Sequence, residues 1–161
     1  MDVGSGPGHD AARLAADGHA VTAVEPTPEL REGARDLYGD LPIVWIDDSL
    51  PFLEHLTSAG TCPFAFILIE GVWAHLTAAE RKHAFPILAG LLSRRGVIAI
   101  SLRHGPAARG RVVFPVTAAE TAGLAAAAGL DTLVNVETGS IQVANIAGGV
   151  TWTRMAFGAS P

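Results

Sequence analysis

A glycine-rich turn at the start of the chain has the residue types of a ligand-binding loop. It reads Asp2-Val3-Gly4-Ser5-Gly6-Pro7-Gly8 and lies between an incomplete strand and a segment of helical pattern. Glycine in such a turn lets the backbone approach a ligand with no side chain in the way. The free N–H groups at the start of the following helix favour a carboxylate or a phosphate. We therefore expect Gly4, Gly6 and Gly8 to contact a bound ligand.

The spacing of these glycines argues against two familiar nucleotide-binding loops. The dinucleotide fingerprint has the order G-x-G-x-x-G, but His9 occupies the position of its third glycine. This mismatch counts against a nicotinamide-dependent oxidoreductase. A P-loop needs a Gly-Lys-Ser/Thr triplet, which the sequence lacks.

Acidic side chains follow three of the predicted strands, which cover residues 20–24, 43–46 and 64–69. These acids are Glu25, Asp47, Asp48 and Glu70. In open α/β sheets, ligands bind outside the carboxyl ends of the strands. We therefore expect these side chains to lie at the same edge of the sheet as the glycine-rich turn.

Two histidines are candidate general bases. His75 and His104 both follow predicted strands, and an imidazole can take a proton from a hydroxyl or an amine near neutral pH. The alternative, that each one packs or hydrogen-bonds structurally, stays open. The remaining histidines show no metal-ligand spacing, so no metal site is expected; they are His9, His19, His55 and His83.

Strands and helices alternate along almost the whole chain. Apolar or β-branched runs predict strands at 20–24, 43–46, 64–69 and 97–102. Helical patterns and capping residues predict helices at 10–16, 28–38, 51–57, 78–95 and 118–128, the fourth ended by Gly96. Two further strands, 130–137 and 150–157, are joined by a loop around Gly148 without a helix and should pair antiparallel. The sequence thus predicts an α/β fold: a doubly wound, mostly parallel sheet with helices on both faces and an antiparallel C-terminal strand pair.

Composition and charge narrow the class of protein. The 161 residues are 49% hydrophobic and 17% charged, which predicts one well-buried domain over residues 1–161. The formal net charge is −5 and basic residues are scattered, so neutral or small partners are favoured over nucleic acid. Cys62 is the only cysteine, which fits a reducing, cytoplasmic location. No apolar run is long enough to cross a membrane, and the first residues do not have the pattern of a signal peptide.

The glycine-rich turn resembles motif I of the class I S-adenosylmethionine (SAM)-dependent methyltransferases, in which an acidic and an aliphatic residue precede G-x-G-x-G. Glu25 resembles the acid that binds the ribose hydroxyls of the cofactor. Asp47-Asp48 resembles the acid that accepts from the adenine amino group, and the other member of this pair should cap the next helix. The segment 69–76 is similar to the motif after the fourth strand, whose backbone faces the methionine end. The segment 91–97 looks like the loop before strand five, so the resemblance covers essentially the whole chain.

This resemblance implies SAM as the cofactor and a set of residues that bind it. They are Asp2, Gly4, Ser5, Gly6, Gly8, Glu25, Pro26, Asp47, Asp48, Ser49, Glu70 and Gly71. The leaving group of a sulfonium donor is already activated, so the protein mainly has to hold donor and acceptor in line and exclude water. No conspicuous catalytic dyad is therefore required.

A small molecule is the expected methyl acceptor, and its identity stays open. The sequence lacks the Asn/Asp-Pro-Pro-Tyr/Phe stretch of family members that methylate amino groups of bases or of glutamine. It also lacks the Pro-Cys nucleophile of cytosine C5 enzymes, since Cys62 precedes its proline.

Two alternative functions remain open on the sequence. A nicotinamide oxidoreductase would share Glu25 and the glycine-rich turn. A non-catalytic or truncated cofactor-binding domain would act through protein contacts. The chain starts shortly before Gly4, so most of the first strand and any preceding helix are expected to be missing. The oligomeric state is also open, a homodimer included.

Overall fold

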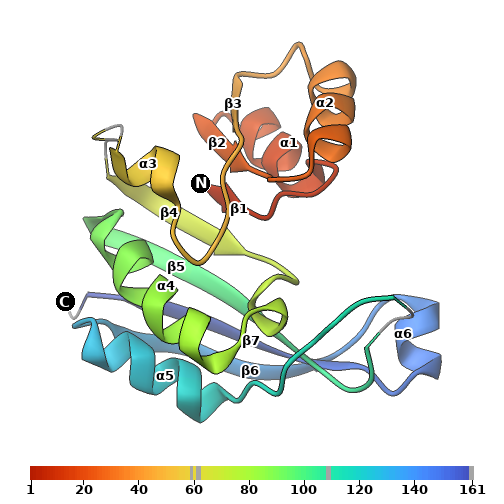
Figure 1. Ribbon diagram of the computed structural model, residues 1–161, viewed down its shortest axis with the longest axis vertical. Coiled ribbons are helices and arrows are strands. Elements are labelled where there is room, and N and C mark those ends of the chain that lie inside the picture. The colour runs from red at the N-terminus through yellow and green to blue at the C-terminus, as the bar shows by residue number, and fades with distance from the viewer. Residues whose placement is uncertain (59, 61–62, 108–109, 160–161) are drawn as a thin grey trace.

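A mixed sheet runs through the computed structural model, which describes residues 1–58, 60, 63–107 and 110–159 (Figure 1). Within these residues, seven strands lie in the order β3-β2-β1-β4-β5-β7-β6. The first five strands are mutually parallel, and β7 lies antiparallel between β5 and β6. The strands are β1 (Asp2–Val3), β2 (Val21–Val24), β3 (Ile43–Ile46), β4 (Phe64–Ile69), β5 (Leu92–His104), β6 (Asp131–Gly139) and β7 (Thr151–Gly158). The predicted fold class is confirmed, including the antiparallel C-terminal pair.

Five helices follow the predicted order, and the short elements η1 and α6 are additional. They are α1 (His9–Ala16), α2 (Pro28–Leu37), α3 (Glu54–Ser58), the 3₁₀ turn η1 (Trp73–His75), α4 (Ala78–Gly90), α5 (Ala118–Ala127) and α6 (Val143–Ala147). The capping box of α4 is present: Thr77 Oγ1 accepts from the backbone N–H of Glu80, whose carboxylate accepts from the Thr77 N–H at 2.7 Å. This reciprocal pair satisfies two N–H groups that the helix cannot bond internally.

Register brings the carboxyl ends of the parallel strands to one edge of the sheet. Val3 at the end of β1 lies opposite Val24 at the end of β2. Val24 in turn lies opposite Ile46 at the end of β3. The loops that follow these strands therefore start side by side, which is where an open α/β sheet binds ligands.

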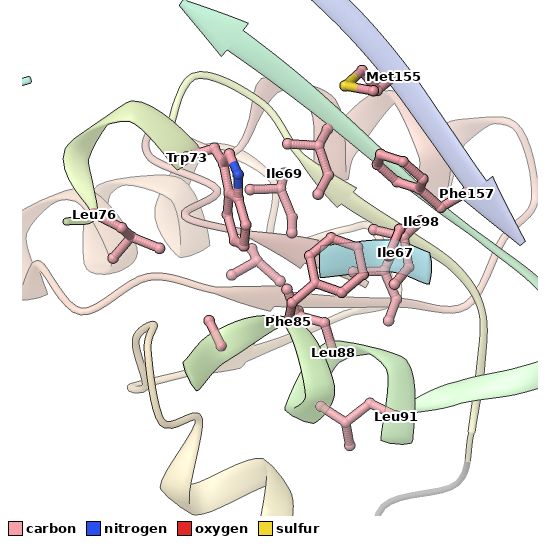
Figure 2. Packing of buried hydrophobic residues seen from close by; sticks show 14 of the residues in the cluster. Ile67, Ile69, Trp73, Leu76, Phe85, Leu88, Leu91, Ile98, Met155 and Phe157 are labelled. Carbon is pink, nitrogen blue, oxygen red and sulfur yellow. The ribbon is translucent and has the colours of Figure 1, made fainter. Parts of the chain in front are cut away.

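The larger hydrophobic core lies between the sheet and the helices α4 and α5. Figure 2 shows Phe85 and Leu88 of α4 pointing toward Ile67 and Phe157 on the strands. Phe85 makes edge-to-face contacts with Trp73 and Phe157, with ring centroids 5.9 and 5.6 Å apart. The fully buried Trp73 fixes the position of η1, because its indole N–H also donates to Thr121 Oγ1 at 3.3 Å.

A smaller core covers the opposite face at the β2–β3 end of the sheet. It joins Ala11 and Ala15 of α1 to Val21 and Ala23 of β2. Because side chains alternate between faces along a strand, Val24 belongs instead to the larger core. Helices thus pack on both faces, as the doubly wound pattern predicts.

The predicted end of the long helix is wrong. The sequence pattern predicts an end near Arg95, but α4 ends at Gly90, and residues 92–95 belong to β5. Phe64 pairs with Leu92, and the register shifts before the next pair, Phe66 with Val97. A Cβ on Gly96 would lie 2.8 Å from the Phe64 carbonyl oxygen. Gly96 therefore permits a close approach of two strands and does not end a helix.

The predicted helix-free connection between the last two strands is also wrong, because it contains α6. Asn145 Nδ2 donates to Gln142 Oε1 at 2.9 Å, and the backbone N–H of Gly148 donates to the Ala144 carbonyl at 3.1 Å. None of the residues of α6 is buried. Without a buried face, the segment carries no amphipathic pattern that a sequence could reveal.

Candidate functional site

A cleft of about 1060 Å³ opens at the carboxyl edge of the parallel strands. One group of lining residues, here called the strand-end wall, comes from 2–10, 25–30, 48–50 and 70–71, at or just after the ends of β1, β2, β3 and β4. A second group, here called the loop wall, consists of Val72, His75, Leu76, Arg111, Val112 and Gln142. The cleft thus has the position expected of a ligand site in this class of sheet.

Most of the predicted site residues line this cleft. Those that do are Asp2, Gly4, Ser5, Gly6, Glu25, Pro26, Asp48, Ser49, Glu70, Gly71 and His75. Gly8, Asp47 and His104 are not among its lining residues. The structure therefore separates the predicted set into residues that face the cleft and residues that lie beside it.

The three glycines of the turn have different surroundings. A Cβ on Gly4 would collide with the Val72 side chain, and one on Gly8 would lie 2.5 Å from the Trp45 ring. At Gly6, which has φ 53°, no atom lies within 4 Å of the same position. Packing therefore explains the absence of a side chain at Gly4 and Gly8, whereas Gly6 leaves space open in the cleft.

Two buried polar atoms of the strand-end wall lack hydrogen-bond partners within the described part of the chain: Asp2 Oδ2 and Ser5 Oγ. Asp2 is 2% exposed. Burial, and to a smaller degree the charge of Asp10, raises the pKa of the Asp2 carboxyl to about 7. Buried polar groups in native proteins are normally hydrogen-bonded, so these atoms fit a ligand that brings its own donors.

Glu25 connects the glycine-rich turn to the loop after β2. Its Oε2 accepts from the Gly6 N–H at 2.9 Å, and its Oε1 accepts from the Thr27 N–H at 2.8 Å. The side chain is 5% exposed, so its geometry is fixed. A carboxylate has about four acceptor positions, which leaves capacity on both oxygens for the hydroxyl groups of a ligand.

The neighbouring acids Asp47 and Asp48 are held differently. Asp48 is buried, and its two oxygens accept from the N–H groups of Ser49 at 2.9 Å and Leu56 at 3.1 Å. It thus anchors the start of α3, and it also lines the cleft, so the capping member of this pair is the one that faces the ligand site. Asp47 is exposed and pairs with Arg31 Nη2 at 2.9 Å. Both acids line a second, smaller cavity of about 300 Å³ that shares Pro26, Asp48 and Ser49 with the cleft.

The end of β4 is fixed by contacts from β5 and β7. Glu70 forms an ion pair with Arg154 Nη1 at 3.0 Å, and that guanidinium lies 6.0 Å from the Trp152 ring centroid. The Gly71 N–H donates to Ser101 Oγ at 2.8 Å. Glu70 therefore reaches the cleft with its charge already balanced.

The two candidate bases differ in position and bonding. His75 lines the cleft, and its Nδ1 lies 2.7 Å from the Val112 carbonyl oxygen. A carbonyl only accepts, so Nδ1 carries the proton and Nε2 of the neutral ring is the acceptor nitrogen. His104 lies outside the cleft lining, with Nε2 2.8 Å from Thr153 Oγ1. Only His75 combines access to the cleft with a defined basic nitrogen.

Sequence reasoning missed the part of the loop wall that precedes α5. The Phe114 N–H donates to the Ala74 carbonyl at 2.7 Å. The buried Arg81 donates to the carbonyls of Leu76 and Pro115. Arg81 Nε also donates to Glu120 at 2.8 Å. Most of these bonds end on backbone carbonyls, which leave no motif in a sequence.

Neither a metal-binding cluster nor a membrane-spanning helix occurs in the part of the chain that the structure describes. Across these ranges, no group of three or more His, Cys, Asp or Glu side chains is arranged to hold a metal ion. No helix there has both the length and the apolarity to span a membrane. Cys62 lies outside the described residues.

Several solved structures share this fold. The magnesium protoporphyrin IX methyltransferase from Synechocystis with bound SAM has a TM-score of 0.74 and 16% identity, over 99% of this chain and 68% of that one. The 1,6-didemethyltoxoflavin-N1-methyltransferase from Burkholderia thailandensis has a TM-score of 0.73 and 22% identity, over 99% and 70%. A pericyclic reaction enzyme has a TM-score of 0.68 and 15% identity, over 99% and only 42%.

No protein-family model and no curated protein matches the sequence. The structural likenesses, at 15 to 22% identity, concern the fold. Together with the strand order and the antiparallel β7, they show that this chain has the Rossmann-like fold of the class I SAM-dependent methyltransferases.

Proposed function

We propose that this protein is a SAM-dependent methyltransferase that acts on a small molecule. The observation that carries the proposal is the buried Glu25 carboxylate, tied to the Gly6 N–H at 2.9 Å. This acid stands at the end of β2 beside a glycine with open space above it. Hydroxyl groups of a nucleoside need such a fixed acceptor, and the open glycine gives the ligand access to the backbone.

The strand-end wall offers a separate group of residues to each part of SAM. Glu25 would bind the ribose hydroxyls, and Asp48 with Ser49 and Pro26 would surround the adenine. Asp2, Ser5 and Gly71 would face the methionine portion, whose ammonium group can donate to the unpartnered Asp2 and Ser5 oxygens. When bound, SAM supplies an activated methyl group attached to a sulfonium.

The loop wall would hold the acceptor and take up its proton. His75 Nε2 is the nitrogen free to accept, because the Val112 carbonyl binds Nδ1–H. A hydroxyl or amine placed at Nε2 can transfer its proton there, which makes its heteroatom a stronger nucleophile. His104 is bonded to Thr153 and lies outside the lining, so we assign it no catalytic role.

A small acceptor is favoured by the size and charge of the site. The cleft of about 1060 Å³ has to hold both cofactor and acceptor. Its charged lining is mostly acidic and the chain carries a net charge of −5, which disfavours nucleic acid. The magnesium protoporphyrin IX and 1,6-didemethyltoxoflavin enzymes of the same fold are themselves named for small-molecule substrates.

The proposal is tested by measuring conversion of SAM to S-adenosylhomocysteine (SAH) by mass spectrometry in the presence of small hydroxyl and amine compounds. The matched variants are Gly6→Arg and Gly18→Arg. Both glycines have positive φ and open space at the Cβ position, but only Gly6 lines the cleft. Wild type and Gly18→Arg should form SAH with at least one compound, and Gly6→Arg should form none. Equal turnover by Gly6→Arg would show that the reaction occurs elsewhere.

The second candidate is a domain that binds the cofactor without transferring methyl groups. The likeness to a pericyclic reaction enzyme favours it, because this fold is not confined to methyltransferases. That candidate predicts SAH binding by the folded protein together with no SAM turnover across the whole panel.

A further inference from the structure

The loop wall contains a cation that nothing in the described chain neutralises. Arg111 lines the cleft and is exposed, and no hydrogen bond or ion pair joins it to a described residue. The arginines near the site are engaged otherwise: Arg31 pairs with Asp47, Arg81 with Glu120, and Arg154 with Glu70. An arginine that faces a cleft without a partner is suited to bind an anionic group of a ligand.

The backbone that follows Arg111 is fixed by hydrogen bonds of Val112, Phe114 and Pro115. Val112 accepts from His75 Nδ1 through its carbonyl oxygen, and the Phe114 N–H donates to the Ala74 carbonyl. Arg81 then holds Pro115 through a 2.9 Å hydrogen bond. Arg111 is therefore one residue from the contact that fixes the base, so an anion at Arg111 and a proton donor at His75 can belong to one small molecule.

Gln142 adds a second donor on the same wall. Its Oε1 accepts from Asn145 Nδ2 at 2.9 Å, which turns the amide oxygen toward α6. The NH₂ group of Gln142 has no hydrogen-bond partner in the described ranges. An amide N–H together with a guanidinium offers the planar donor set that a carboxylate accepts.

The rest of the loop wall is apolar, with Val72, Leu76 and Val112 beside these donors. The strand-end wall of the same cleft carries the carboxyl groups of Asp2, Asp10, Glu25, Asp48 and Glu70. A doubly charged anion would meet strong repulsion there, whereas a single charge can be balanced by one arginine. The wall therefore favours one carboxylate attached to an apolar body.

We propose that the acceptor of this protein is a small carboxylic acid, with its carboxylate bound by Arg111 and Gln142 and its hydroxyl or amine at His75. This inference rests on the proposed methyltransferase function, because the bound acid is a methyl acceptor only if the protein transfers methyl groups. The binding preference itself is a property of the loop wall and can be measured without turnover.

The experiment compares acids with their neutral amides by calorimetry, with and without saturating SAH. The probes are benzoate and benzamide, 4-hydroxybenzoate and 4-hydroxybenzamide, and indole-3-acetate and indole-3-acetamide. At least one acid should bind wild type about tenfold or more tightly than its amide, as expected of a charge-assisted hydrogen bond. Arg111→Gln should abolish that preference, and Arg111→Lys should restore part of it.

Arg103→Gln is the matched control, because it removes the same charge from a residue outside the cleft lining and should leave the preference unchanged. The affinity for SAH should differ less than threefold among all these proteins. Equal binding of acid and amide, binding of neither, or an unchanged preference in Arg111→Gln would overturn the inference. Failure of SAH to bind while the acid preference persists would instead contradict the proposed methyltransferase function.

Discussion

The strand-end wall and the loop wall of the cleft hold their side chains by different means. On the strand-end wall, buried carboxylates accept from backbone N–H groups close to strand ends, as Glu25 does from Gly6 and Asp48 does from Ser49. The loop wall is held by side chains that donate to backbone carbonyls of segments far apart in sequence, as His75 does to Val112 and Arg81 does to Pro115. The first wall is built by the sheet, and the second is attached to it.

Under the proposed function, this difference would separate the binding of the cofactor from the binding of the acceptor. A ligand part common to a whole class of enzymes can be bound by positions that the sheet itself provides. A variable acceptor is better served by connecting segments, because these change without disturbing the core. Variants on the two walls should therefore affect different measurements.

The largest effect should follow from Arg81→Met, which detaches the loop wall. The guanidinium is 1% exposed and bonds Glu120 and two backbone carbonyls, so its loss should lower the free energy of unfolding by about 3 kcal/mol. Urea unfolding measures this free energy. The control is Arg94→Met at an exposed position, which should change the free energy of unfolding by less than about 0.5 kcal/mol. A similar small change in Arg81→Met would mean that the wall is held by other contacts.

His75→Gln should lower turnover, which depends on the loop wall, without lowering the SAH affinity of the strand-end wall. Loss of a positioned base lowers a rate by about 100-fold or more, so turnover should fall to that extent while SAH affinity stays within about threefold of wild type. His104→Gln is the control, because His104 lies outside the cleft lining, and it should retain turnover. If the two variants lose turnover equally, His75 is not the base.

Glu25→Ala should act on the strand-end wall with a somewhat smaller effect. It removes the fixed acceptor and leaves the Gly6 and Thr27 N–H groups without it, so SAH affinity should fall by about 10- to 100-fold. Asp47→Ala serves as the control: this acid is exposed and does not line the cleft. If calorimetry shows a larger loss of SAH affinity for Asp47→Ala than for Glu25→Ala, the assignment of Glu25 as the cofactor-binding acid is wrong.

Asp2 should make stability depend on pH, and within any one pH unit its effect should be the smallest of the four. Burial raises the pKa of its carboxyl from 3.8 to about 7, so the unfolded chain releases this proton at lower pH than the folded protein does. The contribution of Asp2 to stability is therefore complete below pH 4 and is lost as pH rises toward 7, with a slope of at most about 1.4 kcal/mol per pH unit.

The measurement for Asp2 is the difference in unfolding free energy between wild type and Asp2→Asn across this pH range. The amide in this variant does not titrate, so the difference isolates Asp2 from the other acids and histidines. A difference that is constant with pH would show that the carboxyl is ionised normally in the folded protein.

Most residues of the strand-end wall could be predicted from the sequence, because the signals for them are local. The turn from Asp2 to Gly8 and the acids at strand ends lie next to the apolar runs that form the strands, and the structure places most of them on the cleft. Gly8 is a partial exception, since its Cβ position is filled by Trp45, a residue distant in sequence. Composition alone does not distinguish a glycine that packs from one that faces a ligand.

The part of the loop wall formed by Arg111, Val112 and Gln142 could not be predicted from the sequence, because its signals are not local. Arg111 and Gln142 have no neighbouring motif, and the loop wall depends on bonds from His75 and Arg81 to distant carbonyls. The helix α6 has no buried face, and the end of α4 was set by strand pairing at Phe64 and not by helix propensity. Tertiary contacts of this kind override local pattern.

The central claim is that the strand-end wall binds the SAM scaffold, and calorimetric titration of the wild-type protein with SAH tests it most directly. NADH is titrated in parallel, because a dinucleotide enzyme would share Glu25 and the glycine-rich turn. Micromolar binding of SAH with no heat from NADH is the predicted result. Absence of SAH binding to the folded protein, or binding of NADH in its place, would contradict the account.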